Sequence, residues 1–332
     1  MIKVFTAFSG YDSQCMALRR LGLEFDLVGW SEIDRAAINA HNAVFPEYAD
    51  RNYGNICGIN WATVADFDLL TYSSPCTDFS IGGYMKGGEE GSGTRSSLIW
   101  EVERAIIAKR PKYLLFENVP GLTTEKFIKL FHKWQGTLAR LGYVNYTKIL
   151  NSKHYNVPQS RSRVFMVSIL GENPRYYFPP SMPLKRRFFD MVERDVAERY
   201  YISRADLMQK FVKFFNRAEP VLVGWTRSYG NPVYDVNFHE VEVANTLTVC
   251  KRFTTQNYIV EAADRVRQLT PRECLRLMDV NDSDINKMID CNISNTQLYK
   301  LAGNSIVVGV LLQIFRKLFV DKENEDKQLT LF

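Results

Sequence analysis

The chain has 332 residues, of which 46% are hydrophobic and 24% are charged, and its formal net charge is +5. This composition excludes an intrinsically disordered chain and suffices for one large domain or two unequal ones. The six cysteines form no CxxC pair. That pattern excludes a zinc ribbon or a disulfide framework and is typical of a reducing cytoplasm. The mildly basic charge permits nucleic-acid binding without requiring it.

Strand-like and helix-like segments alternate through the first half of the sequence. The expected strands are 2–8, 26–31, 67–72, 112–116, 146–150 and 164–170, and the expected helices are 13–21, 34–45, 97–109 and 125–141. This alternation indicates an α/β fold with a doubly wound sheet and helices on both faces. In such sheets ligands bind in the crevice beyond the carboxyl ends of the strands.

The middle of the chain breaks this pattern. Between residues 171 and 263 the periodicity is poor, prolines cluster and aromatic residues are frequent. A second core-building segment follows, with a helix expected from about Asn304 to Val320 whose apolar run is too short to span a membrane. We therefore expect a large domain of residues 1–170 plus 264–320, a smaller irregular domain of residues 171–263, and a flexible tail, 321–332.

The segment FSGYDSQ follows the first expected strand and opens a helix. Backbone N–H groups at such a helix start suit a nucleotide-like cofactor. Gly10 is its single glycine, so the segment does not fit a dinucleotide fingerprint. Glu32 ends the second strand, a placement that suits a ribose hydroxyl, although a surface carboxylate is the simpler interpretation.

Pro75 and Cys76 stand directly after the expected strand 67–72, in the stretch YSSPCTDFS. A thiolate at a strand end can act as a nucleophile. A lone cysteine is, however, more often a small buried hydrophobe, so its position alone favours a packing role.

Two more stretches combine charged side chains with strand ends. LLFENVPG places Glu117 and Asn118 after a strand, where a carboxylate can act as an acid or simply form part of a surface turn. VPQSRSRVF contains Gln159, Arg161 and Arg163, and two guanidiniums on one face of an extended segment suit phosphate or a carbonyl oxygen. A solvated basic edge strand is the alternative.

Taken in order, the blocks FSGYDS, SEID, GNI, SPCTDFS, FENV, VPQSRSRVF, LTPRE and AGNS resemble the motif series of the cytosine C5-specific DNA methyltransferases of bacterial or phage type. The resemblance covers residues 1–170 and 264–318. The unmatched middle corresponds to the family's variable target-recognition region. The resemblance implies a Rossmann-like, adenosylmethionine-dependent methyltransferase domain beside a smaller target-recognition domain, with a role in cytosine-5 DNA methylation such as restriction-modification.

The same resemblance implies roles for the catalytic residues. Cys76 matches the nucleophile that adds to cytosine C6, so that C5 can take a methyl group from S-adenosylmethionine. Glu117 matches the acid that contacts cytosine N3, and Arg163 matches the contact to cytosine O2 with Arg161 in support. Because the target atom is inaccessible in a stacked duplex, base flipping is required. Pro75 is expected to shape the turn, Asn118 to hold the loop, and Gln159 to lie at the substrate.

For the cofactor, the resemblance implies a site without a metal, from which S-adenosylhomocysteine leaves as the product. The residues that match it are Phe8, Ser9, Gly10, Tyr11, Glu32, Asn55, Ile56, Asn304 and Ser305. Two departures stand out: the family usually has glycines where Asp12 and Ser13 stand, and an aspartate where Asn55 stands. We therefore expect weaker or reshaped cofactor binding rather than none.

Double-stranded DNA is the expected partner, and the protein is expected to be a monomer in the bacterial cytoplasm, at the nucleoid when on DNA, with no membrane association. An RNA (tRNA) cytosine C5 methyltransferase is the main alternative, and a non-catalytic DNA-binding relative is a weaker one. The intact Cys76, Glu117, Arg161 and Arg163 argue against a pure binder.

The last five residues, Gln328–Phe332, read QLTLF after a charged spacer. They resemble the short peptide by which many bacterial DNA-processing proteins dock on the replicative sliding clamp. A five-residue match is short, so a tail of chance composition is the alternative.

Overall fold

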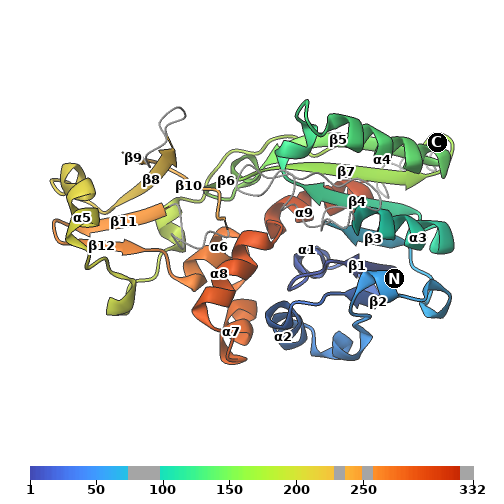
Figure 1. The fold of residues 1–332 in the computed structure, drawn as a ribbon, viewed down its shortest axis with the longest axis horizontal. Coiled ribbons are helices and arrows are strands. Elements are labelled where there is room, and N and C mark those ends of the chain that lie inside the picture. The colour runs from blue at the N-terminus through green and yellow to red at the C-terminus, as the bar shows by residue number, and fades with distance from the viewer. Residues whose placement is uncertain (74–97, 228–235, 249–256, 322–332) are drawn as a thin grey trace. The chain divides into compact units, whose positions relative to one another are not determined.

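A computed structural model of the chain describes residues 1–73, 98–227, 236–248 and 257–321 (Figure 1). The chain forms two compact units: unit 1 comprises Met1–Leu150, Ser162–Pro180 and Val308–Phe332, and unit 2 comprises Asn151–Arg161 and Ser181–Val307. These boundaries group residues 264–307 with unit 2, whereas the sequence assigns them to the catalytic domain. A division by contacts is not a division by function, so the expected domains remain a prediction.

A six-stranded sheet forms the centre of unit 1. Its strands are β1 (Ile2–Ala7), β2 (Phe25–Ser31), β3 (Leu69–Tyr72), β4 (Tyr113–Asn118), β5 (Tyr143–Asn151) and β7 (Ser162–Leu170), in the order β2-β1-β3-β4-β7-β5. The neighbours from β2 to β4 run parallel, and β7 is antiparallel to β4. The chain passes from β2 on one side of β1 to β3 on the other. The carboxyl ends of β1 and β3 therefore flank a topological switch point.

Helices cover both faces of this sheet. Leu114 and Phe116 of β4 point to one face and share a core with α3 (Ile99–Lys109) and α4 (Ile128–Arg140). Tyr113 points to the other face, where its ring lies 5.2 Å from that of Phe319 in the π-helical turn that follows α9 (Val308–Phe315). The α9 helix packs on α1 (Ser13–Arg20), and α2 (Arg35–Val44) follows β2 (Figure 1). The doubly wound α/β fold is thus confirmed.

The largest error in the expected elements concerns the helix placed at Asn304–Val320. An α-helix, α8 (Asn295–Asn304), ends where that helix was expected to begin, and Ser305 is extended before α9 starts. The stretch Asn295–Val320 is long and apolar enough to cross a membrane, but 72% of its most apolar window is buried inside the protein. A buried core helix of a folded domain is equally long and apolar, so this stretch is weak evidence for a membrane span.

Unit 2 contains an antiparallel sheet that the sequence did not predict. Its strands are β8 (Val221–Arg227), β9 (Val236–Glu240), β11 (Asn257–Ala262) and β12 (Arg265–Gln268), in the order β12-β11-β8-β9. Phe211, Phe238 and Tyr258 pack in its core. The short strands β6 (Gln159–Ser160) and β10 (Ala244–Asn245) pair in parallel, and α5 (Ala205–Met208), α6 (Pro271–Leu277) and α7 (Asp282–Asp290) complete the α-helices among the described residues. Several 3-10 turns between residues 188 and 214 explain why the periodicity looked irregular.

The LTPRE block has a structural role in unit 2. Thr270 and Glu273 form a reciprocal capping box that starts α6. Arg267 is completely buried and donates to Glu273 at 2.9 Å, and Glu261 accepts from the same guanidinium. A buried arginine is stable only when its donors are satisfied, so this cluster fixes the junction between β12 and α6.

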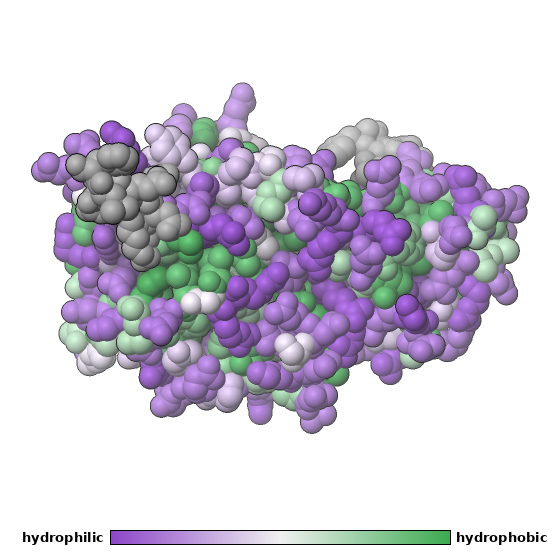
Figure 2. Space-filling model, turned by 180° about the vertical axis from the view of Figure 1, so that it is seen from behind, coloured by the Kyte–Doolittle hydropathy of each residue, from purple (hydrophilic) through white to green (hydrophobic). Residues whose placement is uncertain are grey.

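Hydrophilic residues dominate the face of the molecule in Figure 2, and hydrophobic side chains lie among them in smaller groups. Among the described residues, few large apolar side chains are strongly exposed. Apart from the terminal Met1, the most exposed are Tyr177 and Ile33. Ile33 directly follows Glu32, at the end of β2.

Candidate active site

The predicted cofactor residues of unit 1 gather at the carboxyl edge of the sheet, beside the switch point between β1 and β3. The loop after β1 turns through three left-handed residues, Phe8, Gly10 and Asp12, with φ of 55°, 58° and 66°. The Ser9 N–H donates to the carbonyl of Ser31, which ties this loop to the end of β2. A Cβ atom at Gly10 would meet no atom of the described residues within 4 Å, so these residues leave the space beside the loop open.

Glu32 is bound to this loop. Its Oε2 accepts from the Gly10 N–H at 3.0 Å, and its Oε1 accepts from the N–H groups of Ile33 and Asp34 at 2.8 and 2.9 Å. Asn52 donates from Nδ2 to the Glu32 carbonyl and accepts from its N–H, so the backbone of Glu32 is also held. The carboxylate is half-buried and fixed beside the open space at Gly10.

These residues fit a ribose-bearing cofactor. The Ser9 hydroxyl is buried and makes no hydrogen bond to any residue that the structure describes. The Glu32 carboxylate suits a ribose hydroxyl, and the Ile33 side chain, 72% exposed, offers an apolar surface beside it. Tyr11 is buried under the loop.

Asn55 lies on the following connection, where its Oδ1 accepts from the Cys57 N–H at 3.1 Å and caps a 3-10 turn. Its side chain is exposed, whereas Ile56 is buried. A carbonyl oxygen has two lone pairs, so Asn55 can still accept a second hydrogen bond from a ligand.

The departure at Asp12 has a physical explanation. Asp12 occupies the left-handed conformation that glycine adopts without cost, and its side chain caps α1 by accepting from the Cys15 N–H at 3.1 Å. The other carboxylate oxygen accepts from the Thr6 hydroxyl at 2.9 Å and lies 3.5 Å from Nε2 of His41. A network of buried side chains therefore replaces backbone freedom in this loop.

Glu117 is the second-last residue of β4. This strand extends two residues further than expected, to Asn118. The Glu117 side chain is only 8% exposed. The Oε1 atom lies 3.1 Å from Nε of Arg163, and the Ser73 hydroxyl is 2.5 Å from Oε2. Asn118 is buried, and its Oδ1 accepts from the Val119 N–H at 2.9 Å. Of the predicted catalytic residues, the structure thus brings Glu117 and Arg163 together.

Arg161 belongs to unit 2 and has a different environment. It is 3% exposed, and its guanidinium donates to the carbonyls of Leu247, Gly303 and Ser305, each at 2.8 Å. Gln159 is completely buried nearby, donating to the Leu277 carbonyl and accepting from the Leu247 N–H. Both side chains therefore join segments of unit 2.

Two of the remaining predicted residues, Asn304 and Ser305, lie at the end of α8. Asn304, the last residue of α8, is exposed, and Ser305 is half-buried with its carbonyl bound by Arg161. Pro75 and Cys76 lie outside the described residues. Among the residues that are described, no cluster of three or more His, Cys, Asp or Glu side chains could hold a metal ion.

The sequence model of C-5 cytosine-specific DNA methylases matches residues 2–320. The chain belongs to this family. It is accordingly a DNA cytosine-5-methyltransferase, and the family implies S-adenosylmethionine as the methyl donor and DNA as the substrate.

Relatives of this methylase share nearly its whole length. It is 32% identical to the type II methyltransferase M2.ScrFI of Lactococcus lactis subsp. cremoris, with 96% of this chain and 99% of the relative covered. It is 32% identical to the type II methyltransferase M.NgoBI of Neisseria gonorrhoeae, with 94% and 91% covered. Orphan methyltransferases from Bacillus phages, such as M.SPRI of phage SPR, are also similar, at 27% identity with 98% of this chain and 99% of the relative covered.

Solved structures share the fold of the methylase. The Entamoeba histolytica methyltransferase EhMeth superposes with a TM-score of 0.73 at 17% identity, covering 97% of this chain and 99% of that one. The S. pombe Dnmt2 methyltransferase superposes with a TM-score of 0.68 at 18% identity, covering 98% and 100%. The Rossmann-like methyltransferase fold is therefore confirmed.

Sequence reasoning missed four residues of the methylase that touch the predicted ones. Ser73 bonds Glu117, Asn52 holds the backbone of Glu32, Ile33 exposes an apolar surface beside it, and His41 faces Asp12. Ile33 could have been found from its position in the quoted block SEID, directly after Glu32. Ser73, Asn52 and His41 carry no comparable signal.

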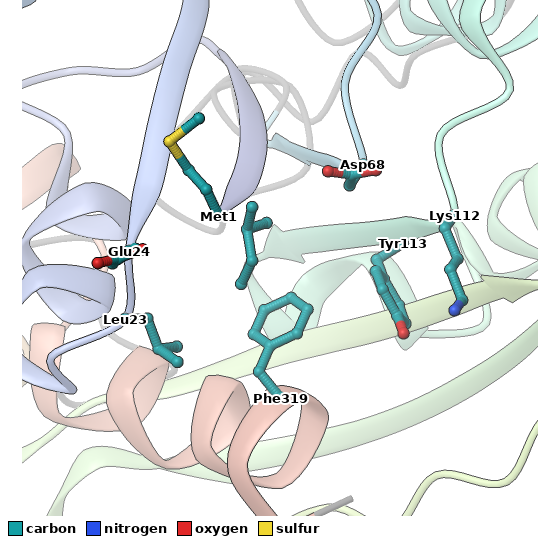
Figure 3. Close-up of a pocket in the computed structure, with 8 residues that line it drawn as sticks. Met1, Leu23, Glu24, Asp68, Lys112, Tyr113 and Phe319 are labelled. Carbon is teal, nitrogen blue, oxygen red and sulfur yellow. The ribbon is translucent and has the colours of Figure 1, made fainter. Parts of the chain in front are cut away.

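A pocket of about 400 Å³ in unit 1 lies away from this site (Figure 3). Met1, Glu24, Asp68, Lys112 and Tyr113 are among its lining residues, and each stands at or just before the first residue of a sheet strand. The pocket therefore marks the amino edge of the parallel strands. Ligands of doubly wound sheets bind at the opposite, carboxyl edge, so this pocket is not the catalytic site.

Proposed function

We propose that this methylase transfers a methyl group from S-adenosylmethionine to C5 of cytosine within a specific sequence of double-stranded DNA, through a covalent adduct between Cys76 and C6 of a flipped base. The observation that carries the proposal is Glu117, a buried carboxyl held by Arg163 and Ser73 at the carboxyl end of β4. A carboxyl there can contact the N3 edge of a base that leaves the duplex.

The chemistry follows from the reactivity of cytosine. The Cys76 thiolate adds to C6, and the electrons of the C5–C6 bond move toward N3, where Glu117 supplies a proton. C5 of the resulting enamine bonds to the methyl carbon, and the sulfonium sulfur keeps the electrons of the broken S–C bond. A base then removes the C5 proton, the electrons of the C5–H bond re-form the C5–C6 double bond and expel the Cys76 thiolate from C6, and the N3 proton returns to Glu117.

The bound cofactor supplies an activated methyl group on a sulfonium sulfur. On this proposal the loop from Phe8 to Tyr11 contacts the cofactor, Glu32 accepts from its ribose, and Ile33 and Asn55 border its base. Asn304 and Ser305 remain candidates from the resemblance. Open space at Gly10 and the fixed carboxylate of Glu32 support this assignment.

Double-stranded DNA is the proposed partner because the family model names DNA methylation. The basic cluster Lys185–Arg187 is a candidate phosphate contact of unit 2. An RNA cytosine methyltransferase remains the alternative. Type II and orphan names both occur among the relatives, so a partner restriction enzyme is a separate question. We also propose that the protein acts as a monomer in the bacterial cytoplasm and docks on the sliding clamp through Gln328–Phe332.

The test compares substrates and a nucleophile variant. Wild-type protein with labelled S-adenosylmethionine should methylate duplex DNA and leave transfer RNA unlabelled, and bisulfite sequencing of DNA from expressing cells should give the target sequence. Duplexes with 5-fluorocytosine at that target should form a denaturant-stable complex with wild type and none with Cys76→Ala. Labelling of transfer RNA alone would favour the alternative, and methyl transfer by Cys76→Ala would refute the covalent step.

A further inference from the structure

We propose that Ser73 is a positioning residue for the reaction, one whose hydroxyl holds the Glu117 carboxyl in a single orientation in both of its protonation states. The inference rests on the proposed function, because it takes Glu117 as the residue that supplies a proton to cytosine N3. Ser73 belongs to none of the residues that the motif series singles out.

The position of Ser73 follows from the register of the sheet. Strands β3 and β4 are parallel neighbours in which Tyr72 pairs with Phe116, so the next residues, Ser73 and Glu117, stand side by side at the carboxyl edge. The Ser73 hydroxyl lies 2.8 Å from the backbone carbonyl oxygen of Glu117 and 2.5 Å from its Oε2. One hydroxyl thus reaches both the backbone and the side chain of the same residue.

The Ser73 hydroxyl can bond the Glu117 carboxyl in either of its protonation states. A serine hydroxyl has one proton to donate and can also accept. When Glu117 is ionised, Ser73 can donate to its carboxylate. When Glu117 is protonated, the hydroxyl can turn its proton to the Glu117 carbonyl and accept the carboxyl proton, so that both short contacts are hydrogen bonds. Ser73 therefore keeps a bond to the carboxyl before and after the proton is transferred.

Arg163 completes the hold on the carboxyl from the other side. Its Nε lies 3.1 Å from Oε1, and its Nη1 donates to the Ser162 carbonyl of its own strand. Arg163 can only donate hydrogen bonds, so its bond to Glu117 is strongest when the carboxylate is ionised. Ser73 is the partner that can reverse its role. With one partner on each oxygen, the plane of the carboxyl is fixed relative to β3 and β4.

Thr71 of β3 provides a matched control. It lies two residues before Ser73, it is almost completely buried, and its hydroxyl makes no hydrogen bond to any residue within the described ranges. Thr71→Val removes a hydroxyl with little change in shape, while Ser73→Ala removes the one that touches Glu117. Ser73→Thr keeps the hydroxyl at the site.

The experiment measures single-turnover methyl transfer to duplex DNA, together with affinities for S-adenosylmethionine and DNA. We expect Ser73→Ala to lower the rate of methyl transfer about tenfold. A positioned acid contributes roughly a hundredfold or more to a rate, and loss of its orientation should remove part of that contribution. Both affinities should stay within about twofold of wild type. Ser73→Thr should restore most of the rate, and Thr71→Val should match wild type.

Three results would overturn the inference: a wild-type rate in Ser73→Ala, a loss confined to cofactor or DNA affinity, or a Thr variant as slow as the Ala variant. Failure of the proposed function gives a different pattern, because wild-type protein itself would then transfer no methyl group to DNA. Glu117→Gln separates the two further: if it is as fast as wild type, the role of Glu117 is wrong, and Ser73 has nothing to position.

Discussion

Asp12 lies 3.5 Å from Nε2 of His41, and both side chains are completely buried. The His41 ring stacks on Trp30 with 3.8 Å between centroids, so α2 and β2 hold the imidazole in place against the loop that starts α1. Thr6 and the Cys15 N–H bind the same carboxylate. The conformation of the cofactor loop is therefore fixed by side chains at a position where the family usually has glycine.

Although the family usually has glycine at this position, Asp12→Gly should weaken S-adenosylmethionine binding by roughly tenfold, because in this chain the Asp12 side chain holds the loop. It should also lower the free energy of unfolding by about 1–3 kcal/mol, because a helix cap and a buried hydrogen bond are lost. Asp12→Asn should have a smaller effect, since asparagine tolerates the left-handed conformation and keeps the capping oxygen. Calorimetry and urea unfolding measure the two quantities. Ser294→Ala, which removes the cap of α8, is the control and should cost stability without affecting cofactor affinity. Unchanged affinity in Asp12→Gly would contradict the role of the network.

Asn55→Asp should tighten S-adenosylmethionine binding by a few-fold, because a carboxylate is a stronger acceptor for an amine than an amide oxygen. The capping bond to the Cys57 N–H should persist, since aspartate is an equally good cap, so stability should stay the same. Calorimetry on both proteins decides the matter. Equal or weaker binding by the aspartate variant would mean that the pocket has adapted to asparagine.

The sheet of unit 1 could be predicted from the sequence because each strand is a short apolar run and each intervening helix has clear periodicity. The position of Glu32 and Glu117 at the carboxyl edge could be predicted for the same reason, since each stands at or just past the end of such a strand, while their roles stay a prediction. In unit 2, by contrast, irregular 3-10 turns precede the strands, and the strand pairing joins segments that no local pattern connects.

Side-chain partners could not be predicted because they depend on contacts between distant residues. Ser73 and Glu117 are 44 residues apart, and Arg161 and Gly303 are 142 apart. A serine two residues before a proline and an arginine in an extended segment look the same whether they bind substrate or protein. Only the register between β3 and β4 distinguishes Ser73 as a partner of Glu117.

A peptide of residues 321–332 should bind a purified bacterial sliding clamp at about micromolar strength, because a short peptide bears an ordering cost that limits its affinity. Fluorescence anisotropy with a labelled peptide measures this. The matched control carries Leu331→Ala and Phe332→Ala, which removes the apolar pair expected to fill the clamp pocket. Equal binding by the two peptides would end the idea. Deleting the tail should leave methylation of short duplexes unchanged.

The free energy of unfolding should fall as pH rises above about 9. Burial raises the pKa of the Cys15 and Cys274 thiols well above the usual 9.0, and Asp12 adds to the effect at Cys15. A group whose pKa is raised by folding stabilises the protein below its unfolded pKa and loses that contribution as pH rises. Between its unfolded and folded pKa, each such thiol should therefore lower the free energy of unfolding by up to about 1.4 kcal/mol for each unit of rise in pH.

Urea unfolding at pH 7.5, 9 and 10 tests this fall, with Cys15→Ala as the variant that should show a shallower decline. A thiol reagent gives an independent readout. In native protein it should modify the exposed Cys57 and leave Cys15 and Cys274 unreacted until the chain is denatured. Rapid labelling of Cys15 in native protein would contradict its burial.

Arg161→Ala should destabilise the protein by about 3–5 kcal/mol, because the carbonyls of Leu247, Gly303 and Ser305 lose a shared donor inside unit 2. Arg161→Lys should recover part of this loss, since an ammonium group cannot reach three carbonyls in a fixed plane. The control is Arg187→Ala, whose side chain is 83% exposed and whose loss should cost less than about 0.5 kcal/mol. Urea unfolding measures all three variants. If Arg161 instead acted mainly on the base, Arg161→Lys would keep wild-type stability and still lose the covalent complex with 5-fluorocytosine DNA.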